Sequence, residues 1–205
     1  MNSTIKKLLK KVISKAYSFR LRNKATYKGS VDFSYTSKIL LSNGSKKQDI
    51  VLNDRGRMYA TLVSKFGGKI TFEENVKVGY GSVIACISEI KIGRGTAIAH
   101  QVTIIDNNNH PTHPEDRKIM YNSPWDSPLR NWNYSASAPI FIGENVWIGT
   151  GSRIHKGVTI GDNSIIAAHA MVTRDVPANC IVAGNPARVV KENIQDEPRL
   201  IPDNE

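Results

Sequence analysis

Aliphatic residues recur at every sixth position in the C-terminal half of the chain, and few folds can accommodate that spacing. The series consists of Ile142, Ile148, Ile154, Ile160, Ile166 and Val172. A helix repeats about every 3.6 residues and a simple strand about every 2, so neither element explains the pattern. Hexapeptide repetition is typical of a parallel β-helix, in which the chain winds as a three-sided coil with one inward aliphatic residue on each side.

Two earlier groups of residues extend the same pattern toward the N-terminus. They are Phe72, Val78 and Ile84, followed after two additional residues by Ile92, Ile98 and Ile104. Three hexapeptides make one turn of about 18 residues, and stacked turns bury continuous apolar columns. The strands of a sandwich would instead alternate with a period of about 2 and have irregular turns. The sequence therefore predicts an all-β chain built as a parallel β-helix.

The predicted β-helix domain spans residues 29–184, although residues 31–68 show only short β-rich runs between polar turns. Residues 1–28 predict a basic amphipathic helix, because apolar residues fall at helical spacing and lysines fill the opposite face. This helix either packs on its own domain or lies on an anionic membrane surface through residues 1–24. Residues 185–205 are expected to form a short C-terminal helix and a tail.

The composition narrows the classes of partner. The chain has 28 Lys and Arg against 18 Asp and Glu, and nine of the basic residues lie in residues 1–28, which contain no acid. This excess suggests an anionic partner, but no nucleic-acid-binding motif is present, so we expect none of that class. Cys86 and Cys180 form no CxxC pair, which argues against a zinc knuckle or redox dithiol. No apolar run reaches about 18 residues, so we expect a cytoplasmic protein, with peripheral contact at the inner membrane face as an alternative.

A long polar segment, about residues 106–139, interrupts the repeats. It is rich in Asn and Pro and carries two of the three tryptophans. A loop of this length inside a regular solenoid is usually functional. Its aromatic rings and hydrogen-bond donors would suit sugars, and its arginines an acidic sugar or a phosphate. The candidate ligand-binding residues of this segment are Arg117, Tyr121, Trp125, Arg130, Trp132 and Tyr134.

Four motifs in residues 140–191 carry a resemblance to a known family. They are VWIG, GVTIG, VTRDVPAN and AGNPARVV. The segment resembles the C-terminal half of hexapeptide-repeat O-acetyltransferases, the group that includes maltose, galactoside, Nod-factor, capsule and O-antigen acetyltransferases. The resemblance extends over residues 72–191. It implies a left-handed β-helix, a homotrimer with active sites between subunits, acetyl-CoA as co-substrate and no metal. It also implies that the candidate ligand-binding residues of the long segment bind the saccharide acceptor.

The resemblance also implies a catalytic histidine in a His-Pro pair within the long loop. His110 precedes Pro111, and His113 precedes a second proline. The family pattern D-x-x-x-H-P fits Asp106 and His110 better, so His110 is the predicted general base and His113 the alternative. Histidine suits this role because its pKa lies near working pH. Asp106 or a backbone carbonyl would hold the ring tautomer, and attack would be direct, without an acyl-enzyme.

Other residues of the family motifs are expected to hold coenzyme A in a groove between adjacent subunits. Small side chains would admit the pantetheine arm, and basic side chains would face the phosphates. The expected contacts are Trp147, Thr150, Ala168, Thr173, Arg174, Arg188 and Lys191. The histidines within the coils are instead interpreted as structural or interfacial; these are His100, His155 and His169.

The sequence thus predicts an acetyl-CoA-dependent O-acetyltransferase that modifies a saccharide hydroxyl, for example in a surface polysaccharide or its precursor. Three alternatives remain. The acceptor could be the amine of a nucleotide-linked amino sugar. The fold also serves zinc enzymes of the γ-carbonic anhydrase type, but the histidine spacing here does not reproduce their arrangement. Finally, the chain could be a non-catalytic scaffold.

Overall fold

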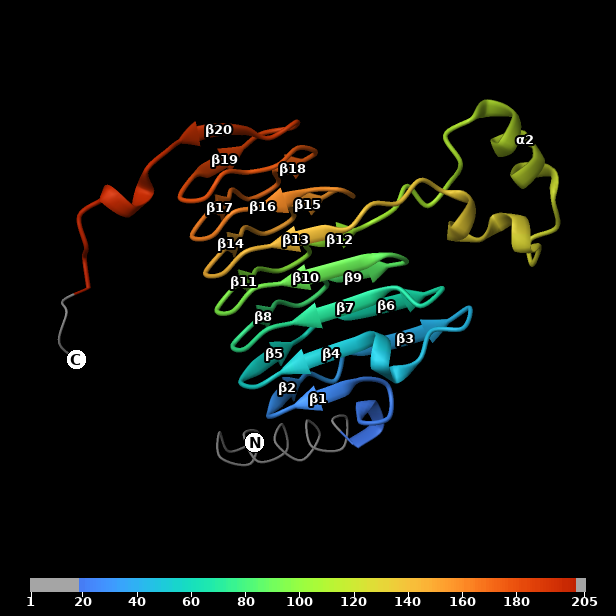
Figure 1. Cartoon of the computed structure of the whole chain (residues 1–205), viewed down its shortest axis with the longest axis horizontal. Helices are drawn as coiled ribbons and strands as arrows, with labels where there is room; N and C mark the ends of the chain where they lie inside the picture. Colours follow the sequence, from blue (N-terminus) through green and yellow to red (C-terminus); the bar gives the residue numbers. More distant parts are fainter. Residues whose placement is uncertain (1–18, 202–205) are drawn as a thin grey trace, which may run out of the picture.

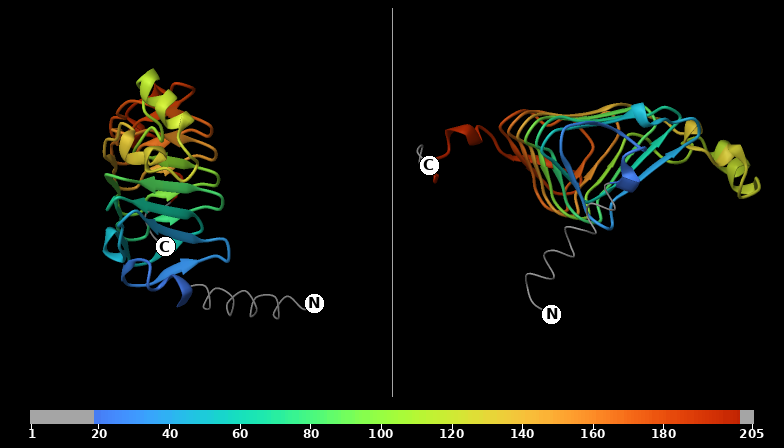
Figure 2. Two further views of the ribbon diagram at one scale, coloured as in Figure 1. Left: turned by 90° about the vertical axis from the view of Figure 1, so that its right-hand side faces the viewer. Right: turned by 90° about the horizontal axis from the view of Figure 1, so that it is seen from below.

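The computed structural model describes residues 19–201, which wind as a three-sided coil that rises from the N-terminal to the C-terminal end (Figure 1). Seen along its axis, the coil has a triangular outline, and one segment projects from a corner (Figure 2). Most of the basic helix predicted for residues 1–28 falls outside the described residues. The coil confirms the parallel β-helix that the hexapeptide spacing predicts.

Each side of the coil is one sheet, and successive turns add one strand to each sheet. Sheet A contains β1 (Thr26–Lys28), β4 (Ile50–Asn53), β7 (Lys69–Phe72), β10 (Glu89–Ile92), β13 (Ile140–Ile142) and β16 (Thr159–Ile160). Sheet B contains β2 (Val31–Phe33), β5 (Gly56–Met58), β8 (Lys77–Val78), β11 (Ala97–Ile98), β14 (Trp147–Ile148), β17 (Ile165–Ile166), β19 (Ile181–Ala183) and β20 (Arg188–Lys191). Sheet C contains β3 (Lys38–Ser42), β6 (Thr61–Lys65), β9 (Val83–Cys86), β12 (Thr103–Ile105), β15 (Arg153–Ile154) and β18 (Met171–Val172). The three corners are called the A–B, B–C and C–A edges.

Aliphatic side chains form a continuous column inside each sheet, because parallel pairing in register stacks equivalent residues. The column of sheet C consists of Ile39, Leu62, Ile84, Ile104, Ile154 and Val172, each at most 2% exposed. Burying one such side chain contributes about 1.5–3 kcal/mol. The aliphatic residues that recur at hexapeptide spacing are therefore the residues of the hydrophobic core.

Asparagine stabilises the A–B edge. Asn145, Asn163 and Asn179 stand at equivalent corner positions with φ of 53°, 60° and 57°, a left-handed conformation that Asn tolerates well. Each side chain hydrogen-bonds the next, at 3.0 Å from Asn145 Nδ2 to Asn163 Oδ1 and 3.0 Å from Asn163 Nδ2 to Asn179 Oδ1. The ladder adds side-chain hydrogen bonds to the backbone hydrogen bonds that already join successive turns at this edge.

The coil continues below the regular hexapeptides. β1 begins at Thr26, three residues before the predicted start of the domain, and pairs with β4 in parallel. The irregular residues 31–68 add further turns with a short 3₁₀ helix, η1 (Lys47–Asp49), and two five-residue strands, β3 and β6. These longer strands break the spacing of six, but alternate side chains still point into the coil. The same core therefore extends toward the N-terminal end.

The predicted C-terminal helix is wrong. Arg188–Lys191 forms strand β20, which pairs antiparallel with β19, and only a single 3₁₀ turn, η4 (Ile194–Asp196), follows it. Gly184, with a φ of 95°, reverses the chain between the two strands. β19 is the last parallel rung, and its open edge needs a hydrogen-bonding partner. Two consecutive valines favour a strand at this place.

The inserted segment leaves the coil after β12, returns at β13 and projects from the C–A edge (Figures 1 and 2). It contains helix α2 (Pro114–Asn122) and two 3₁₀ turns, η2 (Pro128–Arg130) and η3 (Trp132–Tyr134). A proline in the first helical position and two acidic residues in the first turn favour the start of α2. The segment expected to be a loop is therefore partly helical.

Candidate active site

The insert is anchored to the coil by Asp106, which is fully buried. Its carboxylate accepts the backbone N–H groups of Ile87 and Ser88, the latter at 2.7 Å from Oδ2. Ile87 and Ser88 are the two additional residues between the hexapeptide groups. This two-residue insertion therefore supplies the N–H groups that bind the carboxylate. Charge-assisted hydrogen bonds of this kind are stronger than neutral ones.

The thiol of Cys86 completes this anchor. Its Sγ lies 3.1 Å from Asp106 Oδ2 and donates a hydrogen bond to it. Burial, together with the Asp106 charge, raises the pKa of the Cys86 thiol far above its ordinary value, so the group stays protonated. Cys86 therefore serves as a hydrogen-bond donor and not as a nucleophile.

Hydrogen bonds extend from this anchor along the segment that precedes His110. Asn107, 6% exposed, donates from Nδ2 to Asp106 Oδ1 at 3.1 Å and accepts the N–H of Asn109 at 2.8 Å. Asn107 also bridges Ser137 on the returning leg of the insert. Among the described contacts, none joins Asp106 directly to His110. The sequence names Asp106 or a backbone carbonyl as the group that holds the His110 tautomer, and this assignment stays a prediction. The hydrogen bonds of Asp106 hold the beginning of the insert, four residues before His110.

His110 is exposed at a hollow of about 690 Å³ inside the insert. The hollow is bordered by aromatic and hydrogen-bonding side chains, including Tyr121, Trp125, Ser127, Arg130 and Asn131. His113 does not border it. This residue immediately precedes α2, and its carbonyl accepts the N–H of Arg117 at 3.2 Å. The two candidate bases thus occupy different surroundings.

The predicted acceptor-binding residues divide into exposed rings and internal braces. Tyr121 and Trp125 are 77% and 88% exposed at the hollow. Arg130 is a brace: its Nη2 donates to the carbonyls of Tyr121 and Ser123, each at 2.9 Å. Its guanidinium also lies 5.2 Å from the centroid of the Trp125 ring. Arg130 therefore holds the C-terminus of α2 and one wall of the hollow.

Two further predicted residues have structural partners. Arg117 donates to the carbonyl of Thr112 within the same turn. Trp132 receives the ammonium of Lys65 over its ring, 4.1 Å from the centroid. Lys65 lies at the end of β6, so this cation–π contact fastens the insert to sheet C.

Three of the predicted coenzyme contacts gather at sheet B and the B–C edge. Trp147 projects from β14 with 57% exposure and pairs in register with Ile165 of the next turn. Thr150 and Ala168 stand at successive corner positions of the B–C edge, where the carbonyl of Thr150 accepts the N–H of His169 at 2.8 Å.

The other predicted coenzyme contacts lie elsewhere. Thr173 and Arg174 follow β18 and belong to the C–A edge, the edge that also carries the insert. Arg188 and Lys191 lie on β20 at the top of sheet B, and Lys191 pairs with Glu197 at 2.5 Å. Within one chain, the predicted coenzyme contacts therefore lie at two different edges of the triangular coil. Thr150 and Ala168 are at the B–C edge, and Thr173 and Arg174 are at the C–A edge.

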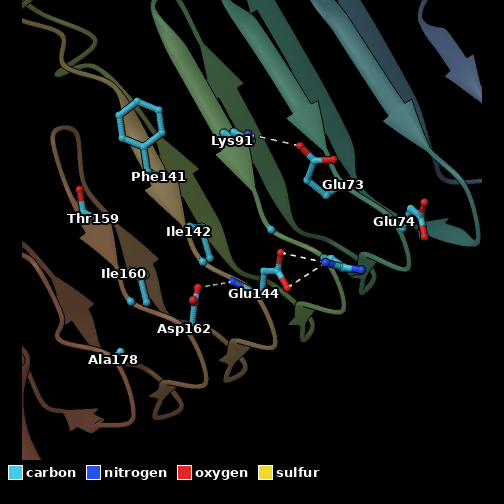
Figure 3. Close-up of a pocket in the computed structure, with 14 residues that line it drawn as sticks. Glu73, Glu74, Lys91, Phe141, Ile142, Glu144, Thr159, Ile160, Asp162 and Ala178 are labelled. Atoms are coloured by element: carbon cyan, nitrogen blue, oxygen red, sulfur yellow. Dashed lines mark hydrogen bonds and ion pairs between the residues drawn. The ribbon is translucent and has the colours of Figure 1, made fainter.

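A second hollow, of about 750 Å³, lies at the A–B edge (Figure 3). Its charged side chains are already paired: Lys91 with Glu73 at 3.4 Å and Arg94 with Glu144 at 3.3 Å. Asp162 accepts the backbone N–H of Glu144 at 2.7 Å. None of the predicted site residues lines this hollow.

A feature missed by sequence reasoning lies on the B–C edge. The N–H of Tyr80 donates to Nδ1 of His100 at 2.9 Å, and the two rings stack with centroids 5.8 Å apart. Gly79 makes this possible, since a Cβ there would lie 2.8 Å from His100 Nδ1. The spacing of Tyr80 and His100, one coil apart, was the signal in the sequence that could have revealed the pair.

Within residues 19–201, His, Cys, Asp and Glu side chains form no group of three or more that could hold a metal ion. The same part of the chain contains no helix that is both long enough and apolar enough to cross a bilayer.

Comparison with known proteins identifies the family. The model of the bacterial transferase hexapeptide repeat (six repeats) matches residues 139–174. A galactoside O-acetyltransferase of Escherichia coli is 39% identical over 129 residues, which cover 62% of this chain and 56% of that protein. The putative lipopolysaccharide biosynthesis O-acetyl transferase WbbJ of Escherichia coli is 34% identical over 61% of each chain. The chain thus spans somewhat more than half the length of these curated relatives.

A solved galactoside acetyltransferase in complex with coenzyme A is 31% identical, with a TM-score of 0.55 over 81% of this chain and 70% of that one. The chain belongs to the hexapeptide-repeat acetyltransferases, and its fold is the left-handed parallel β-helix of that family. The resemblance inferred from the sequence motifs is confirmed.

Proposed function

We propose that the protein transfers the acetyl group of acetyl-CoA to a hydroxyl of a saccharide, in a surface polysaccharide or its precursor, and that it acts in the cytoplasm. The observation that carries the proposal is the position of His110 at a hollow bordered by Tyr121 and Trp125. Exposed aromatic rings suit the apolar faces of sugars, and a histidine suits the activation of a hydroxyl. Relatives named as sugar O-acetyltransferases support the substrate class.

In the proposed reaction, His110 accepts the proton of the acceptor hydroxyl while the hydroxyl oxygen attacks the thioester carbon. The carbon–sulfur bond then breaks, His110 returns the proton to the sulfur so that coenzyme A leaves as its thiol, and the product is an acetyl ester. The neutral imidazole is a competent base near neutral pH. The protonated, buried Cys86 supports direct transfer, because this thiol cannot act as an acyl carrier.

Residues of the upper coils would hold the coenzyme. The small corner residues Thr150 and Ala168 would admit the thin pantetheine arm, with the exposed ring of Trp147 beside it. The cationic side chains of Arg188 and Lys191, both exposed on β20, would face the phosphates.

We further propose that the active form is a homotrimer with its active sites between subunits. The insert, Thr173 and Arg174 lie on the C–A edge, whereas Thr150 and Ala168 lie on the B–C edge. A cleft between two parallel copies would bring the C–A edge of one subunit to the B–C edge of the next. This arrangement would unite residues that a single chain separates.

The decisive experiment is mass spectrometry of saccharide acceptors incubated with the protein and acetyl-CoA. A galactoside, a maltooligosaccharide, a bacterial capsule oligosaccharide and an amino sugar are compared, and mild base distinguishes a labile ester from a stable amide. We expect the ester. Acetylation of the amino sugar alone, or of none of the acceptors, would overturn the assignment.

The two histidines provide the matched variants. Replacing His110 by Ala is expected to lower kcat about 10²–10⁴-fold, the usual contribution of a general base. Replacing His113 by Ala should leave kcat within a few-fold of the parent, because this residue lies outside the hollow. The opposite outcome would transfer the role of base to His113.

A further inference from the structure

The lower half of the B–C edge carries a stack of aromatic rings that the proposed transfer site does not include. The ring centroids of Tyr59 and Tyr80 are 4.8 Å apart, and those of Tyr80 and His100 are 5.8 Å apart. We call Tyr59, Tyr80 and His100 the aromatic edge. Tyr80 is 43% exposed, so the stack lies at the surface and is not part of the core.

The aromatic edge presents oriented hydrogen-bond donors. Because the N–H of Tyr80 donates to Nδ1 of His100, the ring proton of this histidine resides on Nε2. The phenol groups of Tyr59 and Tyr80 add hydroxyls that can donate or accept. The Tyr80 ring lies between its two neighbours in the stack, Tyr59 on the turn below and His100 on the turn above. The edge therefore offers polar atoms to hydroxyls and carboxylates.

Positive charge flanks the aromatic edge on sheet B. Arg57 and Lys77 are cross-strand partners on β5 and β8, and both are exposed. The Arg57 guanidinium lies 5.7 Å from the centroid of the Tyr59 ring. Asp32, the partner of Arg57 on the turn below, forms no ion pair with it, and among the described residues neither cation is paired with a carboxylate. The two charges therefore remain open to an anionic ligand.

The aromatic edge is continuous with the residues proposed to hold the acetyl donor. Tyr80, His100, Thr150 and Ala168 occupy the same corner position in successive turns. The backbone N–H of Gly151 donates to the carbonyl of His100 at 3.0 Å, which joins the two parts of the edge. An elongated ligand can thus extend from the transfer site along one straight edge of the coil.

We propose that the aromatic edge, with Arg57 and Lys77, binds a saccharide chain that carries carboxylates, so that the natural acceptor is an acidic polysaccharide or oligosaccharide. This inference rests on the proposed function, which supplies the saccharide. The carboxylates pair with Arg57 and Lys77, and ring hydroxyls bond to the tyrosine hydroxyls and to Nε2 of His100. The pattern of donors and the position of the Tyr80 ring between its two neighbours favour a glycan over a nucleic acid.

The test is isothermal titration of the full chain with octagalacturonate, an acidic oligosaccharide, and with maltooctaose, its neutral counterpart of equal length. We expect octagalacturonate to bind more tightly and its affinity to fall with added salt. The double variant Arg57→Gln, Lys77→Gln should lower that affinity about tenfold, since two exposed ion pairs are lost. Tyr80→Phe, which keeps the ring but removes the hydroxyl, should lower it a few-fold.

The matched control removes the same charge from sheet A. Lys28→Gln with Lys69→Gln changes two exposed cations on β1 and β7, away from the aromatic edge, and should leave the affinity unchanged. Equal losses in both double variants, or equal binding of the acidic and neutral chains, would overturn the proposal. Tighter binding of single-stranded DNA or of phosphatidylglycerol vesicles, lost in the Arg57 and Lys77 variant, would also overturn it.

The titrations contain no acetyl-CoA, so their outcome is separate from that of the transfer reaction. Absence of octagalacturonate binding counts against the aromatic edge alone. Tight binding without acetyl transfer to any acceptor counts against the proposed function alone.

Discussion

The coil and the insert of this protein are built in opposite ways. In the coil, aliphatic side chains such as Ile104 and Leu62, both fully buried, stack in columns. In the insert, Met120 is buried, while Tyr121 and Trp125 expose 77% and 88% of their area. The coil thus obtains its stability from a repetitive core, whereas the insert leaves large aromatic side chains exposed. Comparing the two regions separates the residues that hold the fold from those proposed to carry the chemistry.

The largest expected effect on stability comes from the core of the coil. Ile148 is fully buried on β14, at the centre of its column. Replacing it by Ala removes three carbons and leaves a cavity, so we expect the free energy of unfolding to fall by about 2–5 kcal/mol. Chemical denaturation followed by circular dichroism measures the change. The matched variant Tyr121→Ala in the insert should change stability by less than about 0.5 kcal/mol. Similar losses in both variants would break the distinction between core and recognition surface.

The second prediction concerns the junction of the two regions. Asp106→Asn keeps the size of the side chain but removes the charge that accepts the N–H groups of Ile87 and Ser88. We expect a loss of roughly 1–3 kcal/mol in stability, since buried donors lose a charged acceptor. Cleavage of residues 106–139 by limited proteolysis should become faster, and acetyl transfer should decline because the segment before His110 loosens.

The exposed residue Asp126 supplies the control for the junction, since it also lies in the insert but is far less buried. Asp126→Asn should change neither the proteolysis rate nor the stability. If Asp106→Asn preserved both properties as well, the insert would be independent of the anchor, contrary to the hydrogen bonds described above.

The smallest expected effect comes from the contact of the insert with β6. Lys65→Gln removes the cation from the face of Trp132 and is expected to cost about 0.5–1 kcal/mol. A double-mutant cycle with Trp132→Leu isolates this coupling from general changes in solvation. Additive effects of the two substitutions would show that the insert does not depend on this contact.

Sequence reasoning succeeded where local spacing and tertiary packing obey the same rule. The aliphatic period of six predicted the coil, because each inward residue meets its counterpart one turn away. It failed at Arg188–Lys191, where the apolar run was interpreted as a helix but forms strand β20. The need of β19 for an edge partner decided that outcome, and the need arises only once the coil has formed.

The candidate site shows the same division. The position of His110 after Asp106 was readable from the motif, but the partners of Asp106 were not. Ile87 and Ser88 lie about twenty residues earlier in the chain, and they meet the carboxylate because the coil superimposes successive turns. Likewise, Arg130 was expected to bind an acceptor, and the structure shows that its Nε and Nη2 groups donate to carbonyls at the end of α2.

The sequence by itself determined the winding of the chain, because a repeated apolar position specifies which side chains must face inward. It also marked the one segment that departs from the repeat and contains His110. Only the tertiary structure decided which side chains share an edge. Tyr80, His100 and Thr150 are distant in sequence, yet stacking places them on one corner, while Thr173 falls on another. Such neighbours depend on the exact number of residues in each turn, which the average spacing of six does not reveal.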